Sequence, residues 1–309
     1  MSNLVRLEKG LTRLEGMGRL IESFLSSQDV KETSKKTYQR GLKQFSLWVN
    51  QEKVINPTRD HILEYRTHLE GRGLSSYSVS SYLVAVRKFF EWSEGSRLYP
   101  NIARGIKGPK KPKNFSKDPL TLDQVKGLLN SIPRSSLRGK RDYALLNLLI
   151  RTGLRTVEVI RADIKDISQK SGEAVLWIQG KGRDSKDEFV LLTQDTLGPI
   201  REYLAERNAQ ESEPLFTSQS DRNQNDRLCT RSISRICKDH LKGIGLNDGR
   251  LTAHSLRHTS ATLSLLGGAS LQETQALLRH ANINTTLIYS HNIDRLKNAP
   301  ERKIDALLA

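Results

Sequence analysis

Apolar side chains recur at helical spacing through the first hundred residues. Tyr38, Leu42, Phe45 and Val49 follow one another at three- and four-residue steps, which places them on one face of a helix. Runs of β-branched residues, which would favour strands, are few. The pattern therefore predicts a small all-helical domain. Its amphipathic segments cover residues 20–25, 33–50, 58–70 and 76–93.

The rest of the chain mixes helical and strand patterns. Thr121 and Gln124 form a capping-box pair ahead of an apolar helix, so a second domain is expected to start at Thr121. Two apolar runs, residues 174–179 and 188–192, flank the polar turn GKGRDSKD and predict two strands. Further helices are predicted at residues 141–151, 197–208, 231–242, 255–266, 271–279 and 301–308.

Residues 105–117 (GIKGPKKPKNFSK) have the composition of a linker. They contain two glycines, two prolines and five lysines, and they lack an apolar period. A solvated loop and a basic strap along DNA phosphates both fit this composition, and the flanking domains favour the strap. We place the domains at residues 15–105 and 119–309, with the linker at residues 106–118.

Charge narrows the class of partner. The formal net charge is +16, and the isoelectric point is near 9.9. A surplus of this size favours a polyanion, and nucleic acid is the commonest one, although ribosome-associated and membrane-surface proteins are also basic. Residues 1–118 are the more basic part of the chain per residue.

Composition also bears on location. The longest apolar stretches, such as residues 143–150, are far shorter than a membrane span, and the N-terminus lacks a secretory pattern. Cys229 and Cys237 have no metal-ligand spacing, which predicts two reduced thiols. We therefore expect a cytoplasmic, nucleoid-associated protein with no membrane partner.

Four short motifs in the second domain carry side chains suited to phosphate chemistry. Arg155 lies in TGLRTVEV at a helix start, and Lys181 lies in the turn between the predicted strands. His254 and Arg257 are three residues apart in HSLRH, which puts them on one face of a helix start. The fourth motif, LLRHANINTTLIYSH, places a histidine nine residues before a tyrosine.

Together these motifs resemble those of the tyrosine recombinases, the integrase, Cre and Xer group. That family has an Arg after Thr-Gly-Leu, a hairpin Lys, His-x-x-Arg, a later His or Trp, and a Tyr. The agreement is highly specific and spans about 135 positions. The resemblance covers roughly residues 15–309, and the helical N-terminal part matches in pattern only. The matching residues are Arg155, Lys181, His254, Arg257, His280 and Tyr289.

The resemblance implies that Tyr289 attacks a DNA phosphodiester, and the chemistry of the side chains agrees. Arg155 and Arg257 can hold the non-bridging oxygens and stabilise the extra negative charge of the transition state. A tyrosine hydroxyl with a pKa near 10 needs help to act as a nucleophile, and His254 is the predicted general base. Lys181 is the predicted acid for the leaving 5′ oxygen.

His280 would donate a hydrogen bond to the same phosphate. The arginines take the part that metal ions have in nucleases, so we expect no metal and no cofactor. The covalent 3′-phosphotyrosine would keep the energy of the broken bond, so religation would need no ATP.

Taken singly, several of these residues have ordinary explanations. Arg155 could be a surface arginine paired with Glu158. Arg183 and Lys186 are rivals for the role of Lys181, because the whole turn is rich in charge. The joint order of the six residues favours the catalytic interpretation.

The histidines and the tyrosine also have alternatives. His254 and His258 are four residues apart and could suggest zinc, but a clear third ligand is missing from the sequence. His280 could be a histidine at a helix C-terminus. Tyr289 could be a core tyrosine, and the neighbouring Ser290 has no evident base of its own.

One position departs from the family pattern. The family usually has glycine before the second histidine, whereas this chain has Arg279. An arginine at this position could add a phosphate contact or alter the turn that places His280.

The resemblance also implies a fold and an assembly. We expect a mainly α protein with a small antiparallel β element, in which a helical core-binding domain and an α+β catalytic domain form a C-shaped clamp on double-stranded DNA. A homodimer would bind inverted half-sites, and two sites would synapse into a homotetramer. Strand exchange would pass through a Holliday junction, for integration, excision or resolution, and accessory proteins could take part. The apolar stripe of Ile304, Leu307 and Leu308 would dock on a neighbouring subunit or pack on its own domain.

Two other functions fit parts of the sequence. A type IB topoisomerase shares this chemistry but relaxes supercoils as a monomer, and the short chain and trailing tail argue against it. A non-catalytic DNA-binding regulator would not need the six residues. The short stretch ahead of the first helices favours a simple Cre- or Xer-like recombinase without the arm-binding domain of lambda-type integrases.

Overall fold

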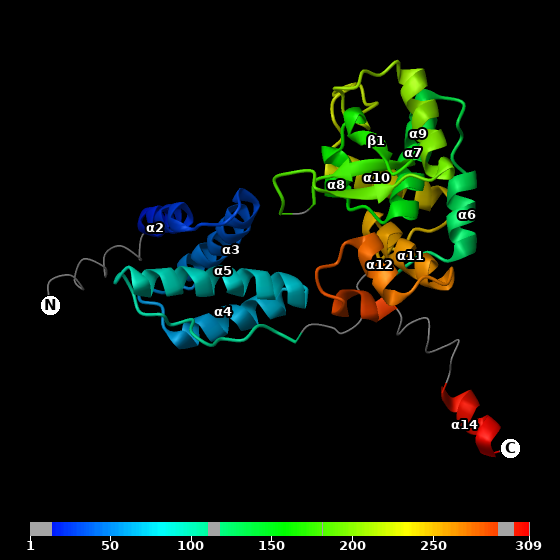
Figure 1. Ribbon diagram of the computed structural model, residues 1–309. Coiled ribbons are helices and arrows are strands. Elements are labelled where there is room, and N and C mark those ends of the chain that lie inside the picture. Colours follow the sequence, from blue (N-terminus) through cyan, green and yellow to red (C-terminus); the bar gives the residue numbers. More distant parts are fainter. Residues whose placement is uncertain (1–13, 111–117, 181, 290–299, 309) are drawn as a thin grey trace. The chain divides into compact units, whose positions relative to one another are not determined.

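The chain folds into two compact units, Met1–Asn114 and Phe115–Ala309. The computed structural model describes residues 14–110, 118–180, 182–289 and 300–308. Both units are built mainly from helices, and the second also holds a small antiparallel sheet (Figure 1). The predicted mainly α class with a small β element is confirmed. The clamp arrangement and the domain limits stay predictions.

The described part of the N-terminal unit contains four helices, and each overlaps a predicted segment. They are α2 (Leu14–Ser27), α3 (Glu32–Gln51), α4 (Arg59–Gly71) and α5 (Ser76–Gly95). Helices α3 and α5 make the most extensive helix pair of this unit. Their backbones approach closely at Gly41, because a Cβ built there would lie 2.7 Å from the Cβ of Ala85.

Aromatic rings fill the core of this unit. The ring centroids of Phe45 in α3 and Tyr65 in α4 lie 5.0 Å apart, and the rings meet edge to face, which is a favoured geometry for aromatic pairs. Leu42 and Val49 are buried beside Phe45, and Tyr38 packs partly buried against the same cluster. The helix face predicted from the apolar period is therefore confirmed as part of the core.

The C-terminal unit is built around a buried helix. The helices described from end to end are α6 (Leu122–Asn130), α7 (Leu137–Thr152), α8 (Thr156–Arg161), α9 (Gln194–Arg207), α10 (Thr230–Gly243), α11 (Ala253–Leu266), α12 (Leu271–Leu278) and α14 (Pro300–Leu308). Helix α7 packs against both α9 and α11. Every side chain from Ala144 to Ile150 is buried. This stretch includes the polar Asn147, whose side-chain amide donates to the backbone carbonyl of Asp195. Among the described helices, α7 included, we find none long and apolar enough to span a membrane.

The sheet has three antiparallel strands in the order β1-β2-β3. They are β1 (Ile167–Lys170), β2 (Glu173–Ile178) and β3 (Glu188–Leu191). Strands β2 and β3 are the predicted pair, with Trp177 opposite Phe189. The sequence interpretation missed β1, because its residues ISQK are mostly polar, are mostly exposed at the sheet edge and show no apolar alternation. Helix α7 also begins four residues earlier than the predicted start at residue 141.

Candidate active site

Helix α11 carries three side chains of the candidate site. The backbone N–H of Thr252 donates to Oγ of Ser255 at 3.0 Å, so a capping box fixes the first turn. His254, Arg257 and His258 then follow at spacings of one helical turn or a single residue. All three line the same open pocket.

Arg257 is held by the ends of two other helices. Its guanidinium donates to the carbonyl of Gly153, which follows α7, and to the carbonyl of Leu278, the last residue of α12. Burial lowers the pKa of Arg257 to about 9, and the nearby Arg155 and Arg279 lower it further. The group remains charged at neutral pH. Two helix C-termini, which carry partial negative charge, thus fix this cation in the pocket.

Arg155 stands immediately before α8 and is held by Glu158. The Arg155 backbone N–H donates to Oε2 of Glu158 at 2.8 Å, and Nη1 of Arg155 donates to Oε1 at 2.7 Å. The pairing expected of a surface arginine is therefore present. However, Glu158 is fully buried and Arg155 lines the pocket, so the pair belongs to the site.

Tyr289 is the last described residue of a helical stretch that begins at residue 284, and it points into the unit. It is 4% exposed, and its hydroxyl lies 2.6 Å from Nδ1 of His258. Its ring is nearly parallel to that of His280, with ring centroids 6.5 Å apart. Burial raises the pKa of Tyr289 to about 12, although Arg257 and Arg155 oppose the rise. At neutral pH the hydroxyl keeps its proton and needs an acceptor to become a nucleophile.

His258 is the functional side chain that the sequence interpretation missed. It was weighed only as a zinc ligand, together with His254. Burial lowers the pKa of His258 to about 4, and the nearby His254 and Arg257 lower it as well. A neutral His258 can accept a hydrogen bond from the Tyr289 hydroxyl. Its place four residues after His254, one helical turn on, was the available signal.

His280 is anchored beside the tyrosine. Its Nδ1 lies 2.9 Å from Oγ1 of Thr286, and its backbone carbonyl accepts from Nε2 of Gln275 at 2.8 Å. Burial, followed by the charges of Arg257 and Arg155, lowers the pKa of His280 to about 4. His280 is therefore neutral at physiological pH, so it can offer a hydrogen bond but no positive charge.

Five of the six predicted site residues come together in one pocket of about 390 Å³. The sixth, Lys181, lies outside the described residues. The individual roles assigned to the six residues stay predictions. The pocket is lined by Arg155, His254, Arg257, His258, His280, Ala281, Asn282, Thr285 and Tyr289.

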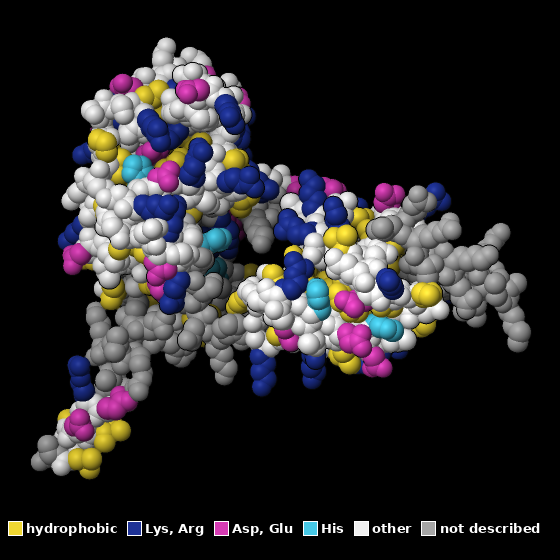
Figure 2. Space-filling view, turned by 180° about the vertical axis from the view of Figure 1, so that it is seen from behind, with side chains coloured by type: hydrophobic (Ala, Val, Ile, Leu, Met, Phe, Trp, Pro, Cys, Tyr) yellow, Lys and Arg dark blue, Asp and Glu magenta, His cyan; other side chains and the backbone are white. Residues whose placement is uncertain are grey.

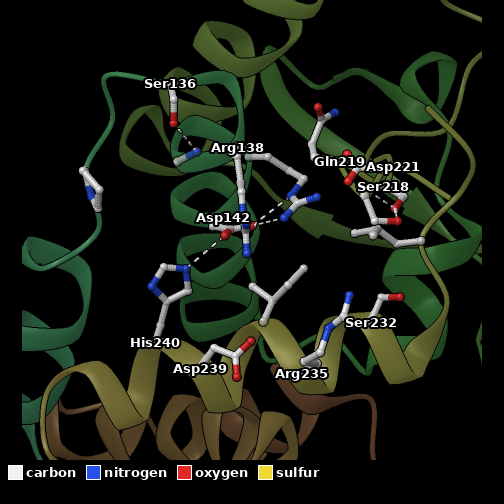
Figure 3. A pocket seen from close by; sticks show the side chains of 16 residues that line it. Ser136, Arg138, Asp142, Ser218, Gln219, Asp221, Ser232, Arg235, Asp239 and His240 are labelled. Carbon is white, nitrogen blue, oxygen red and sulfur yellow. Dashed lines mark hydrogen bonds and ion pairs between the residues drawn. The ribbon is translucent and has the colours of Figure 1, made fainter. Parts of the chain in front are cut away.

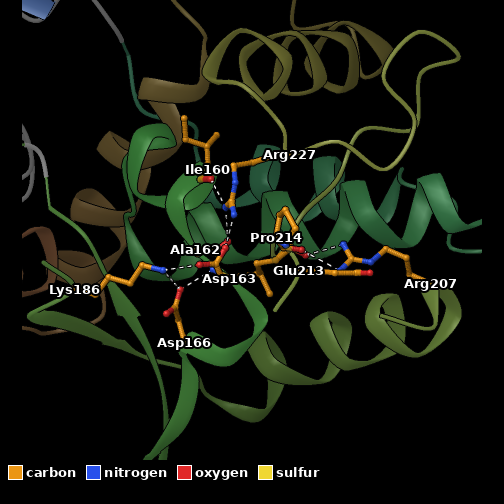
Figure 4. Close-up of polar contacts among 10 residues, drawn as sticks. Ile160, Ala162, Asp163, Asp166, Lys186, Arg207, Glu213, Pro214 and Arg227 are labelled. Atoms are coloured by element: carbon orange, nitrogen blue, oxygen red, sulfur yellow. Dashed lines mark hydrogen bonds and ion pairs between the residues drawn. The ribbon is translucent and has the colours of Figure 1, made fainter. Parts of the chain in front are cut away.

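The two rivals of Lys181 are held in ion pairs. Nζ of Lys186 lies 2.9 Å from Asp163 and 2.5 Å from Asp166, which precede strand β1 (Figure 4). Arg183 pairs with Asp187 within the turn, 2.5 Å away. Because carboxylates already neutralise both cations, neither is well suited to protonate a leaving oxygen.

A larger pocket, of about 680 Å³, shares no residue with this site. It lies between the start of α7, helix α10 and the segment after residue 217 (Figure 3). Buried Arg141 donates to Asp142, and Nε2 of His240 lies 3.0 Å from the other oxygen of Asp142. These contacts link α7 to α10, so we interpret this region as structural.

The candidate site can therefore bind a phosphate diester and activate an oxygen nucleophile. Two fixed guanidiniums supply positive charge, and low exposure strengthens their interaction with an anion. A protonated hydroxyl lies next to a neutral imidazole, which is the arrangement of a nucleophile and its proton acceptor.

Comparisons with known proteins agree with this chemistry. The phage integrase family matches residues 119–295, and the phage integrase N-terminal SAM-like domain matches residues 21–95. Tyrosine recombinase XerA from Pyrococcus furiosus is 30% identical over 286 residues, which cover 92% of this chain and 93% of that protein. Tyrosine recombinase XerC from Escherichia coli O157:H7 is 33% identical over 223 residues, which cover 71% of each chain.

Solved structures share the fold. XerH recombinase bound to palindromic difH substrate has a TM-score of 0.72 at 24% identity, over 92% of this chain and 84% of that chain. A lambda integrase dimer bound to a COC′ core site has a TM-score of 0.69 at 17% identity, over 89% of this chain and 76% of that chain. The family match spans more than half of the sequence. The chain therefore belongs to the phage integrase family and is a tyrosine-type site-specific recombinase.

Proposed function

We propose that this recombinase cleaves and rejoins DNA at a specific site through a 3′-phosphotyrosine link to Tyr289. The observation that carries the proposal is the convergence of the Tyr289 hydroxyl, two guanidiniums and three histidines on one pocket. The related XerH was captured on its DNA substrate in a post-cleavage complex, which supports the same class of reaction.

Phosphate binding falls to the two arginines. Arg257 is pinned between helix ends and Arg155 is held by Glu158, so both cations are in place before DNA arrives. Preorganised charge is effective because no reorganisation is needed when negative charge develops on the phosphate. His280, fixed through Nδ1 by Thr286, would donate from Nε2 to a non-bridging oxygen.

The covalent step exchanges one phosphodiester bond for another. The Tyr289 oxygen forms a bond to phosphorus while the bond to the 5′ oxygen breaks. The hydroxyl proton would pass to His258, which lies 2.6 Å away, rather than to His254, the general base predicted from the sequence. Exposed His254 lines the same pocket and would contact the phosphate. Lys181 would give a proton to the 5′ oxygen. Religation runs the same transfers in reverse with a new 5′ hydroxyl.

The DNA partner would be gripped by both units. Lys and Arg side chains are spread over the visible face of each unit (Figure 2), and the net charge is +16. The structures of XerH on palindromic difH and of a lambda integrase dimer on DNA support inverted half-sites bound by a homodimer. A DNA partner would place the protein at the nucleoid, in the cytoplasm.

The synapse would join two such dimers into a tetramer and exchange strands through a Holliday junction. Helix α14 exposes Ile304, Leu307 and Leu308. The catalytic unit has an apolar groove of about 660 Å³, whose lining includes the exposed Phe189 and Leu191 of β3. We assign the groove to α14 of a neighbouring protomer, because docking would bury apolar surface on both partners.

Recombination between two copies of the site tests the proposal. Tyr289→Phe protein, which should bind DNA without cutting it, would first recover the site from genomic fragments. Wild-type protein should then delete or invert the segment between two sites on a plasmid, and Tyr289→Phe should not. Relaxation of plasmids that lack the site, without recombinant products, would instead indicate a topoisomerase.

A further inference from the structure

Arg279 has a backbone conformation that residues other than glycine rarely adopt. It follows α12 with φ 54° and ψ 47°, the left-handed conformation that favours glycine. The family pattern has glycine at this position, so an arginine here calls for a compensating contact.

The contact lies inside the catalytic unit. The Arg279 side chain is 8% exposed, its Nη1 donates to the carbonyl of Leu277 at 2.6 Å, and its Nη2 donates to Oε2 of Glu158 at 3.0 Å. A buried arginine is stable where it is paired and hydrogen-bonded, and both conditions hold. Arg279 therefore points to the residue that also holds Arg155.

Glu158 joins two guanidiniums. Its Oε1 accepts from the Arg155 side chain, and its Oε2 accepts from both the Arg155 backbone and Arg279. Burial raises the pKa of Glu158, but Arg279 and then Arg155 outweigh it and hold the pKa below its ordinary value. Without Arg279, one oxygen of a fully buried carboxylate would lose its charged partner. We expect Glu158 then to take up a proton or to change its position, so that Arg155 would no longer be held in place.

We propose that Arg279 is a positioning residue for Arg155 and acts through Glu158. The proposal rests on the function proposed above, in which Arg155 binds the scissile phosphate. Arg155 lines the catalytic pocket, whereas Arg279 does not. Arg279 also lines the apolar groove assigned above to α14. We expect its effect on cleavage to pass through the shared carboxylate rather than through this groove.

Two variants separate the side chain from the backbone. Arg279→Met keeps most of the length of the side chain and removes its charge. Arg279→Gly removes the side chain and also relieves the strain of the left-handed backbone conformation. Both should slow single-turnover cleavage by about 10- to 100-fold, since small misplacements of a catalytic group have effects of that size. Arg279→Lys should recover part of the rate. Lys140→Met, which removes the ion pair of Lys140 with Glu206, is the matched control and should cleave at the wild-type rate.

A mutant cycle tests the route through Glu158. In a Glu158→Gln background, Arg279→Met should cause little further loss of rate, because the carboxylate that transmits its effect is gone. If the rate losses of the two single variants instead multiply in the double variant, the proposal is overturned. A fall in melting temperature that parallels the fall in rate would also overturn it, because it would indicate a purely structural role.

Arginine labelling tests the positioning without any DNA reaction. Phenylglyoxal modification, mapped by mass spectrometry, should be several-fold faster at Arg155 in Arg279→Met than in wild type. Arg151, paired with Asp195 in the same unit, serves as the internal reference. Unchanged labelling of Arg155 would overturn the proposal. Failure of wild-type protein to cleave DNA would count against the proposed function, and the labelling result would still decide the role of Arg279.

Discussion

The Tyr289 hydroxyl and Nδ1 of His258 lie 2.6 Å apart in a pocket that also holds two guanidiniums. Burial raises the pKa of Tyr289 to about 12 and lowers the pKa of His258 to about 4. At neutral pH the tyrosine is therefore protonated and the histidine can accept its proton. Activation of the nucleophile should depend on this pair.

Replacing His258 should slow the covalent step. His258→Phe keeps a planar ring but removes the acceptor, so we expect the rate of adduct formation to fall by about 100-fold. Binding to the DNA site, measured by gel shift, should change little. His240→Gln, outside the catalytic pocket, is the control. An unchanged cleavage rate in His258→Phe would show that His258 is not the acceptor.

The same burial makes folding depend on pH. The pKa of His280 is about 4 in the folded chain, against an ordinary value of 6.5. As pH falls below about 6.5 the unfolded chain takes up this proton first, so the stability present above pH 6.5 is lost as pH falls towards 4. Urea unfolding without DNA should show a smaller loss between pH 7 and pH 4.5 for His280→Asn than for wild type. Equal losses would contradict the buried, neutral state of His280.

At the scale of elements, close helix packing supports the N-terminal unit. Helix α3 meets α5 at Gly41, where an added Cβ would lie 2.7 Å from that of Ala85, closer than real Cβ atoms come. Gly18 in α2 has open space around it. Helix packing therefore requires glycine at position 41, whereas the space around position 18 would accept a larger residue.

Alanine at these two positions should have opposite effects. Gly41→Ala should lower the free energy of unfolding by about 1–3 kcal/mol, because the helices must separate. Gly18→Ala should be neutral or raise it by up to about 1 kcal/mol through helix propensity. Chemical denaturation followed by tryptophan fluorescence measures both. A Gly41→Ala protein as stable as wild type would show that the helices do not pack this closely.

Elements with a clear apolar period were predictable, and those without one were not. The face of α3 from Leu42 to Val49 could be predicted because burial repeats with the helical period. Strand β1 could not, because it forms by pairing with β2 at an exposed edge. Ordered motifs indicated most of the pocket. The contact between His258 and Tyr289 could not be predicted, because tertiary folding brings together residues 31 positions apart. The same holds for the contact of Arg279 with Glu158, which lie 121 positions apart.

At the scale of the whole molecule, the proposed assembly depends on the tail helix α14 and the apolar groove. Leu307 and Leu308 are 86% and 81% exposed on α14, which is unfavourable unless a partner covers them. The groove offers apolar walls that include Leu129 and Leu263. Assembly and DNA cleavage should therefore be separable.

Charges on the tail should prevent assembly. Leu307→Asp with Leu308→Asp should abolish tetramers on paired sites, measured by analytical ultracentrifugation, and should lower recombination at least tenfold. Binding of one protomer to a half-site should remain. Asp305→Asn on the same helix is the control. Full tetramer formation by the double variant would contradict the assignment of the groove to α14.

Trapping the covalent link between Tyr289 and DNA tests the proposed mechanism without relying on recombination. Nicked suicide duplexes that carry the target site would be incubated with protein in EDTA, and the adduct would be isolated on denaturing gels and digested. Mass spectrometry should place the DNA remnant on the peptide that contains Tyr289, and Tyr289→Phe should give no adduct. An adduct on another residue, or one that persists in Tyr289→Phe, would show that Tyr289 is not the nucleophile.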